Sequence, residues 1–260
     1  LRNADPQIMQ LLKAADPGNQ YAVPWMWGTT GLIYNPDKIK AAMPNAPLDS
    51  LDMILKKDVA ARFAGCGIAM LDSWGDVLPM VSRYLGQPRL SADKPQLDAV
   101  MAKLQEVQPY IRRISTAGYY QQLAEGDLCL ALGYSGDAMV ARRMVKESHG
   151  SIKLEYSFTR EMVPFYIDSM VIPADSPNAA AALAFIDFVM QPEISASVTR
   201  FIGFATANAA AVPLLEPAVR DNTLIYPPPA IRRRFELQPA YTTLETRAFT
   251  RAWLSFKSGL

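Results

Sequence analysis

The stretch LCLALGYSGDAMVARRMVKE at positions 128–147 decides the fold class, because two kinds of periodicity meet in it. Residues 128–134 have the character of a short apolar strand. Residues 137–147 have the pattern of a helix that opens on an aspartate suited to be its N-cap. The same alternation recurs along the chain, with strand-like runs at 29–34, 67–71, 152–158 and 165–172 and helical patterns at 76–86, 95–108 and 178–190. This order predicts an α/β protein with largely parallel sheets.

Two segments depart from that regular alternation. Residues 178–190 are apolar nearly all round, so we expect this helix to be buried on most sides. The late segment 205–260 is helical in pattern and interrupted by prolines, and we expect no strand of its own there. In open α/β sheets ligands bind at the carboxyl ends of strands. Two acidic and aromatic groups follow strands in this way, at 72–76 and at 134–137.

Composition excludes several classes of protein. The chain has 260 residues, 26 Lys and Arg against 25 Asp and Glu, and a net charge of +1, which is not the charge of a dedicated nucleic-acid binder. Half of the residues are hydrophobic, enough for a sizeable core. No window has the roughly 18 consecutive apolar residues of a membrane span. The chain starts without methionine or a signal peptide, so we expect a processed product or a fragment.

Catalytic motifs are nearly all missing. The segment 133–136 resembles a nucleophile elbow, but its second glycine comes one position too early. The sole histidine, His149, lies in a polar stretch typical of a helix end. We therefore expect no enzyme, no cofactor and no metal site, and keep a hydrolase using Ser135 with His149 as an alternative from another class. Cys66 and Cys129 lie 63 positions apart, and their number alone leaves a disulfide and two buried thiols equally open.

The stretch VPFYIDSMVIPADS at 163–176 carries the most specific chemistry. Asp168 lies within a strand-like run, where aspartate is depleted, and period-two alternation places it on one face with Tyr166 and Met170. A carboxylate beside an aromatic ring suits an organic cation, through charge-assisted hydrogen bonds and cation–π attraction. The alternative is that Asp168 ends the strand and pairs with a lysine or caps a neighbour.

Two further pairs of this kind follow strands. Tyr134 lies near Asp137, although Asp137 also suits an N-cap. Trp74 lies near Asp76 within the segment 72–76. Three aromatic–carboxylate pairs in a near-neutral chain without catalytic bases indicate binding of a cation rather than its chemical conversion.

Seven motifs run nearly from end to end of the chain: PWMWGTTGLIYNPDKI at 24–39, CGIAMLD at 66–72, GDLCLALGYSGD at 126–137, FYIDSMVIPADS at 165–176, the ATAN after Phe204, IYPP at 225–228 and RAFTRAWLSFKSG at 247–259. With these motifs in this order and spacing, the chain resembles the periplasmic polyamine-binding proteins, the putrescine and spermidine receptors of ABC importers. The putrescine receptors are the most similar branch.

The resemblance implies a two-lobe type II periplasmic binding protein fold with a ligand cleft that closes by a hinge. Lobe one would comprise 1–27 and 165–203, and lobe two 28–164 and 204–260. Family members have about a hundred residues before the position that matches Leu1, so lobe one is expected to be incomplete. Ligand contacts from that upstream part are absent from this sequence.

The resemblance also implies roles for individual residues. Asp137 and Asp168 match the ammonium-binding aspartates, and Asp76 lies near a glutamate that contacts the other amine, with Gly75 as the alternative match. The aromatic positions are changed: tyrosine replaces tryptophan at 134 and phenylalanine at 166, phenylalanine replaces tyrosine at 204, and Trp74 is extra ring surface. Cys66 and Cys129 match a disulfide-bonded pair. The implied function is a monomeric periplasmic receptor that delivers a putrescine-like polyamine to the membrane permease; the alternative cargo is another amine or a guanidinium metabolite.

Overall fold

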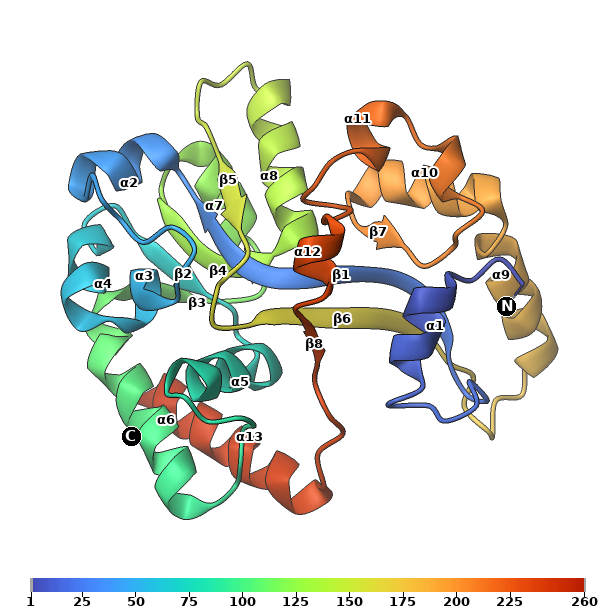
Figure 1. Cartoon of the computed structure of the whole chain (residues 1–260), viewed down its shortest axis with the longest axis horizontal. Coiled ribbons are helices and arrows are strands. Elements are labelled where there is room, and N and C mark those ends of the chain that lie inside the picture. The colour runs from blue at the N-terminus through green and yellow to red at the C-terminus, as the bar shows by residue number, and fades with distance from the viewer. Residues whose placement is uncertain (1, 260) are drawn as a thin grey trace. The chain divides into compact units, whose positions relative to one another are not determined.

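A strand of twelve residues, β1 (Val23–Tyr34), contributes to both units of the fold. The computed structural model describes residues 2–259, and the chain divides into two compact units (Figure 1). Unit 1 comprises Leu1–Thr29, Phe165–Arg233 and Leu237–Ala240, and unit 2 comprises Thr30–Pro164, Arg234–Glu236 and Tyr241–Leu260. The first half of β1 pairs within unit 1 and the second half within unit 2.

The sheet of unit 2 combines parallel and antiparallel pairs. The strand β2 (Ile68–Met70) lies between β3 (Ile111–Ile114) and β4 (Leu130–Tyr134) and is parallel to both. The second half of β1 is antiparallel to β4 and to β5 (Glu155–Ser157), and its register places Thr30 opposite Tyr134. Directly opposite residues share a face of the sheet, so Thr30 and Tyr134 lie on the same face.

Helices pack around the sheet of unit 2. They are α2 (Pro36–Ala42), α3 (Asp52–Leu55), α4 (Lys57–Phe63), α5 (Trp74–Tyr84), α6 (Lys94–Val107), the 3₁₀ turn η1 (Gln108–Tyr110), α7 (Tyr119–Glu125), α8 (Ser135–Glu147) and α13 (Thr243–Ser258). In Figure 1 the C-terminal α13, in red, lies beside α5 and α6. A capping box fixes the start of α13, since Thr242 and Glu245 bond each other's backbone. The core of unit 2 is apolar and fully buried, as at Leu32, Ile68 and Leu104.

A disulfide joins Cys66, after α4, to Cys129, before β4. The backbone N–H of Cys129 also donates to the carbonyl of Gly67 at 3.0 Å. The pairing implied by the family resemblance is thereby confirmed, and the alternative of two free thiols is wrong.

Unit 1 is built on the first half of β1, which is antiparallel to β6 (Val163–Met170) and to β7 (Ala205–Thr206). Trp27 on β1 donates its indole N–H to the carbonyl of Thr206, packs against the rings of Phe165 and Tyr226, and lies under the guanidinium of Arg232. The remaining elements of this unit are α1 (Pro6–Leu12), α9 (Ala179–Val189), α10 (Pro192–Ile202), η2 (Val212–Leu214), α11 (Pro217–Arg220) and α12 (Pro229–Arg232). A short strand, β8 (Phe235–Leu237), follows β6 in the strand order, with Phe235 and Glu236 assigned to unit 2 and Leu237 to unit 1.

Three expectations about secondary structure are corrected. The sheets are not largely parallel, because the four described pairings of β1 are all antiparallel. The reason is the path of the chain: β1 runs from unit 1 into unit 2, whereas β6 runs from unit 2 into unit 1. The segment 205–260 has strands after all, namely β7 and β8. These strands are too short to give an alternating pattern.

The apolar helix α9 is the third correction, since it is not buried on most sides. Only Ile186 and Val189, three residues apart, are buried among its residues. Phe185 is 61% exposed and Phe188 50% exposed. The composition of α9 is apolar all round, but a side chain is buried only where another part of the protein packs against it. Among residues 2–259, other elements cover only one face of this helix.

The expected boundary at residue 204 differs from the division into units. Residues 204–233 belong to unit 1 rather than with the lobe-two segment 28–164. The cause is local: β7 pairs with β1 at Met26 and Trp27, and the side-chain amide of Asn208 donates to the carbonyl of Met190, after α9.

Within residues 2–259 no single helix is long and apolar enough to cross a bilayer. The helices α9 and α10 pass that test only as a pair, and the pair is bent by 75° at the break between them.

Removing the disulfide should destabilise unit 2. The bond closes a loop with a sequence separation of 63, for which chain entropy predicts a loss of roughly 4 kcal/mol in the free energy of unfolding. The measurement is urea unfolding, followed by circular dichroism, of wild type and the double variant Cys66→Ala/Cys129→Ala. Wild type in reductant is the control and should lose a similar amount. Equal stability of all three samples would show that the bond does not constrain the chain.

Candidate functional site

Asp137 lies in the first turn of α8 and is not its N-cap. The helix begins at Ser135, two residues earlier than predicted, with Tyr134 as the cap residue. The Asp137 side chain instead accepts a hydrogen bond from the hydroxyl of Tyr119, with 2.6 Å between Oη and Oδ2. The alternative in which Asp137 caps its own helix is therefore wrong.

Tyr119, the first residue of α7, holds two groups at once. Its side chain is 1% exposed, and its hydroxyl donates to Asp137 and accepts the backbone N–H of Tyr134 at 3.0 Å. The ring fits only because residue 133 is glycine: a Cβ there would lie 2.5 Å from the Tyr119 hydroxyl oxygen. The glycine of the apparent nucleophile elbow thus serves the packing of a tyrosine.

Asp76 has the same position in α5 that Asp137 has in α8, the third residue of the helix. This helix begins at Trp74, again two residues earlier than predicted, so Asp76 is in the first turn and not at the N-cap. Its Oδ1 accepts a hydrogen bond from the Thr30 hydroxyl at 3.1 Å and its Oδ2 one from the Tyr134 hydroxyl at 3.0 Å. Since Gly75 has no side chain, Asp76 is the residue that places a carboxylate here.

Tyr134 joins the two carboxylates of unit 2 into one network. Its backbone N–H bonds Tyr119, which bonds Asp137, and its phenol hydroxyl bonds Asp76. Such linked hydrogen bonds fix the orientation of every member. The structure therefore brings together three of the predicted site residues: Asp76, Tyr134 and Asp137.

Trp74 and Asp72 have other partners. The Trp74 ring packs against Tyr241 and Phe249, with centroids 5.8 and 5.4 Å away. Asp72 accepts the indole N–H of Trp253 at 2.8 Å and lies 2.8 Å from the Lys257 ammonium, so it anchors α13. Of the acidic residues in the segment 72–76, only Asp76 belongs to the network.

In unit 1, Asp168 and Tyr166 share one face of β6. They lie opposite Met26 and Gly28 of β1, as the predicted alternation requires. The rings of Tyr166 and Phe204 are 6.5 Å apart and tilted by 58°. Asp168 is exposed, and within residues 2–259 it has no hydrogen bond or ion pair. The alternatives of a lysine partner or a cap are therefore wrong.

The two aspartates expected to bind ammonium share an electrostatic property. Burial raises the pKa of the Asp137 carboxyl above its ordinary value, and the hydrogen bond from Tyr119 partly opposes this rise. Loss of hydration also raises the pKa of Asp168, although its residue is exposed. Both carboxylates thus lack part of the solvation that a bound cation would replace.

The hydrolase alternative is contradicted by geometry. Ser135 is the first residue of α8, and His149 follows the last residue of that helix by two positions. Thirteen helical residues at 1.5 Å each separate them by about 20 Å. His149 has a left-handed backbone with φ of 54° and is exposed at the helix end. A general base must lie within about 3 Å of its nucleophile, so the two cannot act together.

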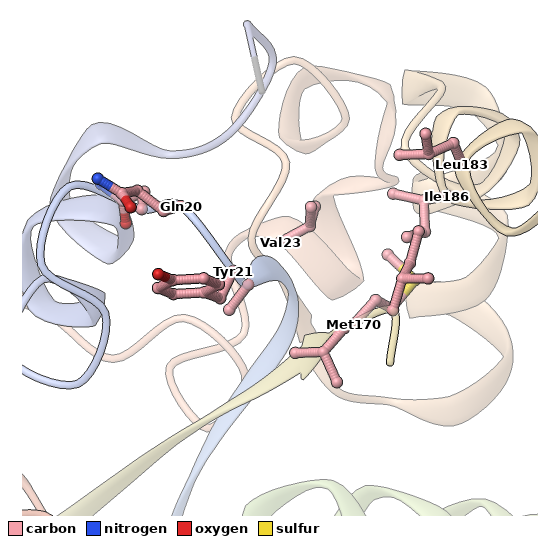
Figure 2. Close-up of a pocket in the computed structure, with 10 residues that line it drawn as sticks. Gln20, Tyr21, Val23, Met170, Leu183 and Ile186 are labelled. Carbon is pink, nitrogen blue, oxygen red and sulfur yellow. The ribbon is translucent and has the colours of Figure 1, made fainter. Parts of the chain in front are cut away.

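A pocket of about 320 Å³ in unit 1 is distinct from these residues. Figure 2 shows Gln20 and Tyr21 on one side of it and Leu183 and Ile186 of α9 on the other. The side chains that line it are apolar apart from the amides of Asn19 and Gln20 and the phenol of Tyr21. None of them is a carboxylate, and none is a predicted site residue. It offers nothing to neutralise an ammonium group.

Sequence reasoning missed two residues of the network, Tyr119 and Thr30. Thr30 could have been found from strand pairing, because it lies directly opposite Tyr134. Tyr119 had no such signal, since only the fold brings it to Asp137 and Gly133.

Comparison with known proteins identifies related chains. The model of the bacterial extracellular solute-binding protein family matches residues 2–226. The putrescine-binding periplasmic protein SpuD of Pseudomonas aeruginosa is 37% identical over 259 residues, which cover 99% of this chain and 71% of that protein. The putrescine-binding periplasmic protein PotF of Escherichia coli is 35% identical over 260 residues, covering 99% and 70%.

Solved structures of similar proteins superpose on this chain. A Listeria monocytogenes protein of 26% identity superposes with a TM-score of 0.85 and covers 100% of this chain and 75% of that one. The spermidine/putrescine substrate-binding protein PotD of Streptococcus pneumoniae, also 26% identical, gives 0.75 over 99% and 74%. The predicted family and the α/β fold of the periplasmic binding protein type are confirmed.

Asp168→Asn should stabilise the ligand-free protein at neutral pH. Because the pKa of Asp168 is raised, the folded protein binds its proton more tightly than the unfolded chain, so stability falls as pH rises from about 3.9 through the raised value and stays lower above it. The variant lacks this titration, and its gain in Tm at pH 7 should shrink as the pH is lowered toward 4. Asp175→Asn, an exposed aspartate of the same unit, is the control. A lower Tm for Asp168→Asn at pH 7 would contradict the expectation.

Proposed function

Since the chain belongs to the bacterial extracellular solute-binding proteins, we propose that it is a periplasmic receptor that binds a linear, putrescine-like polyamine for an ABC importer. The observation that carries the proposal is the pair of carboxylates Asp137 and Asp168, each accompanied by aromatic side chains and each with a raised pKa. Relatives that cover 99% of the chain are named putrescine-binding periplasmic proteins.

In unit 2, Asp137 binds one ammonium group of the ligand. Its Oδ2 is already bonded to Tyr119, so Oδ1 is the oxygen directed to the ligand. The second carboxylate of the network, Asp76, has its own oxygens held by Thr30 and Tyr134. An ammonium group, a compact point charge with three donors, suits such partly occupied acceptors.

In unit 1, Asp168 binds another ammonium group. Its oxygens have no partner within residues 2–259, and Tyr166 lies on the same strand face, with the ring of Phe204 beside it. An ammonium group near an aromatic face gains roughly 0.5–2 kcal/mol of cation–π attraction. Each methylene of the ligand buried against rings adds about 0.8 kcal/mol. Trp74, predicted as extra ring surface, packs against Tyr241 and Phe249 within unit 2.

The relatives are named as binding proteins, and the proposed action is binding without a covalent step or cofactor. The protein acts as a monomer, and permease subunits in the membrane recognise its ligand-bound form. A ligand selects that form only by its higher affinity for it.

A guanidinium metabolite is the second candidate cargo, and one observation favours keeping it. Both oxygens of Asp168 are open, which permits the two parallel hydrogen bonds of a guanidinium. The relative named as a putrescine/agmatine-binding protein in Pseudomonas aeruginosa is 33% identical over 260 residues.

Calorimetry tests the function. Titration of the protein with putrescine, cadaverine, spermidine and agmatine should give a dissociation constant of micromolar or lower for at least one linear polyamine. Tighter binding of agmatine would make the guanidinium cargo the correct one. No heat with any of the four would reject the substrate class.

Polyamine binding should require both Asp137 and Asp168. Asp137→Asn and Asp168→Asn each remove a charge-assisted hydrogen bond of about 1.5–3 kcal/mol, which weakens binding by roughly 10- to 150-fold. Asp93→Asn in unit 2 and Asp175→Asn in unit 1 replace exposed aspartates and should bind as wild type does. Unchanged affinity in either site variant would remove that residue from the binding site.

A further inference from the structure

The geometry around Asp137 points to a role for a residue outside the expected ligand contacts. We propose that Tyr119 is the positioning residue of the polyamine site: its buried hydroxyl holds Asp137 through Oδ2 and thereby presents Oδ1 to the ligand. This inference rests on the proposed function, because it names how one carboxylate of that site is oriented.

The first argument is that the Tyr119 hydroxyl bonds the Asp137 carboxylate and the main chain at the same time. A phenol hydroxyl has one proton to donate, and that of Tyr119 goes to Asp137 at 2.6 Å. The hydroxyl oxygen accepts the N–H of Tyr134 at 3.0 Å. The oxygen is thus held between a main-chain donor and the carboxylate, so the position of Asp137 is set by the backbone at the end of β4.

The second argument is the space made for the ring. Gly133 lies against Tyr119 so closely that a Cβ would be 2.5 Å from its hydroxyl oxygen and 2.6 Å from its Cε2. The ring is 1% exposed and has the ring of Tyr120 at 5.8 Å. A tyrosine clamped in this way has one position for its hydroxyl, which is what a positioning residue requires.

The third argument concerns charge. Burial favours the neutral form of Asp137, which cannot attract an ammonium group as an ion, and the Tyr119 hydroxyl favours the ionised form. Other ionisable groups on the elements packed against α8, and in the network, are Tyr120 and Glu125 of α7, Tyr134 of β4, Asp76 of α5, Tyr156 of β5, and Glu155 of β5, which is paired with Arg142. Within residues 2–259, the hydrogen bond that lowers the pKa of Asp137 comes from none of these groups but from the hydroxyl of Tyr119.

The primary test is the pKa of the Asp137 carboxyl in the ligand-free protein, measured by carbon NMR. In Tyr119→Phe this pKa should rise above the wild-type value. Replacement of Tyr119 by 3-fluorotyrosine keeps the hydroxyl and makes it a stronger donor, so the pKa should fall. The second substitution retains the fold even if the phenylalanine variant does not. A pKa unchanged in the folded variants would overturn the proposal.

Binding provides the second readout. Putrescine affinity, measured by calorimetry from pH 5.5 to 8.5, should be roughly tenfold weaker in Tyr119→Phe at the upper end. The decline of affinity on acidification should begin at a higher pH than in wild type, because Asp137 then takes up its proton earlier. An equal loss at every pH would mark a merely structural role and would contradict the proposal.

The matched control is Tyr84→Phe. Tyr84 also donates its hydroxyl to an aspartate of unit 2, Asp52, at 2.8 Å, but it lies outside the network. This variant should leave both the Asp137 pKa and the pH profile of binding unchanged. If wild type binds no polyamine, the substrate class fails, while the carboxyl titration still decides whether Tyr119 controls Asp137.

Discussion

The cost of removing a carboxylate from water is the constraint on which the site depends. Asp137 is partly buried, and its pKa is raised for that reason. The protein compensates with one hydroxyl from Tyr119 rather than with a basic side chain. A lysine or arginine in that place would neutralise the charge permanently, whereas a neutral donor stabilises the anion and leaves its charge for a cationic ligand.

The fold supplies this donor through strand register and a missing side chain. Antiparallel pairing of β1 with β4 sets Thr30 opposite Tyr134, and both reach Asp76 from one face of the sheet. At the preceding residue of β4, Gly133 leaves room for the ring of Tyr119. The same short strand end therefore orients both carboxylates of unit 2, which explains why the network needs few residues.

The sequence predicted α5, α6, α8 and α9 and the strands β2, β4 and β6 within a few residues, but it missed β3 and α7. It identified the aspartates, but not their partners. Aspartate after a strand and glycine is a common N-cap pattern, and it suggested that Asp76 and Asp137 cap their helices. Both helices start two residues earlier, and tertiary hydrogen bonds take the side chains. The sequence did not predict that α9 is exposed either, because the composition of a helix does not show which other elements pack against it. Family resemblance, by contrast, implied the disulfide between Cys66 and Cys129 that the structure contains.

The tryptophans of the two units lie in different environments, which matters for fluorescence. Its four tryptophans fall two to a unit: Trp25 and Trp27 in unit 1, Trp74 and Trp253 in unit 2. Trp27 lies under a guanidinium, and the Trp253 indole N–H is bound to a carboxylate, so their emission should differ in wavelength and in quenching. Intrinsic fluorescence can thus follow each half of the molecule separately, with no dye attached.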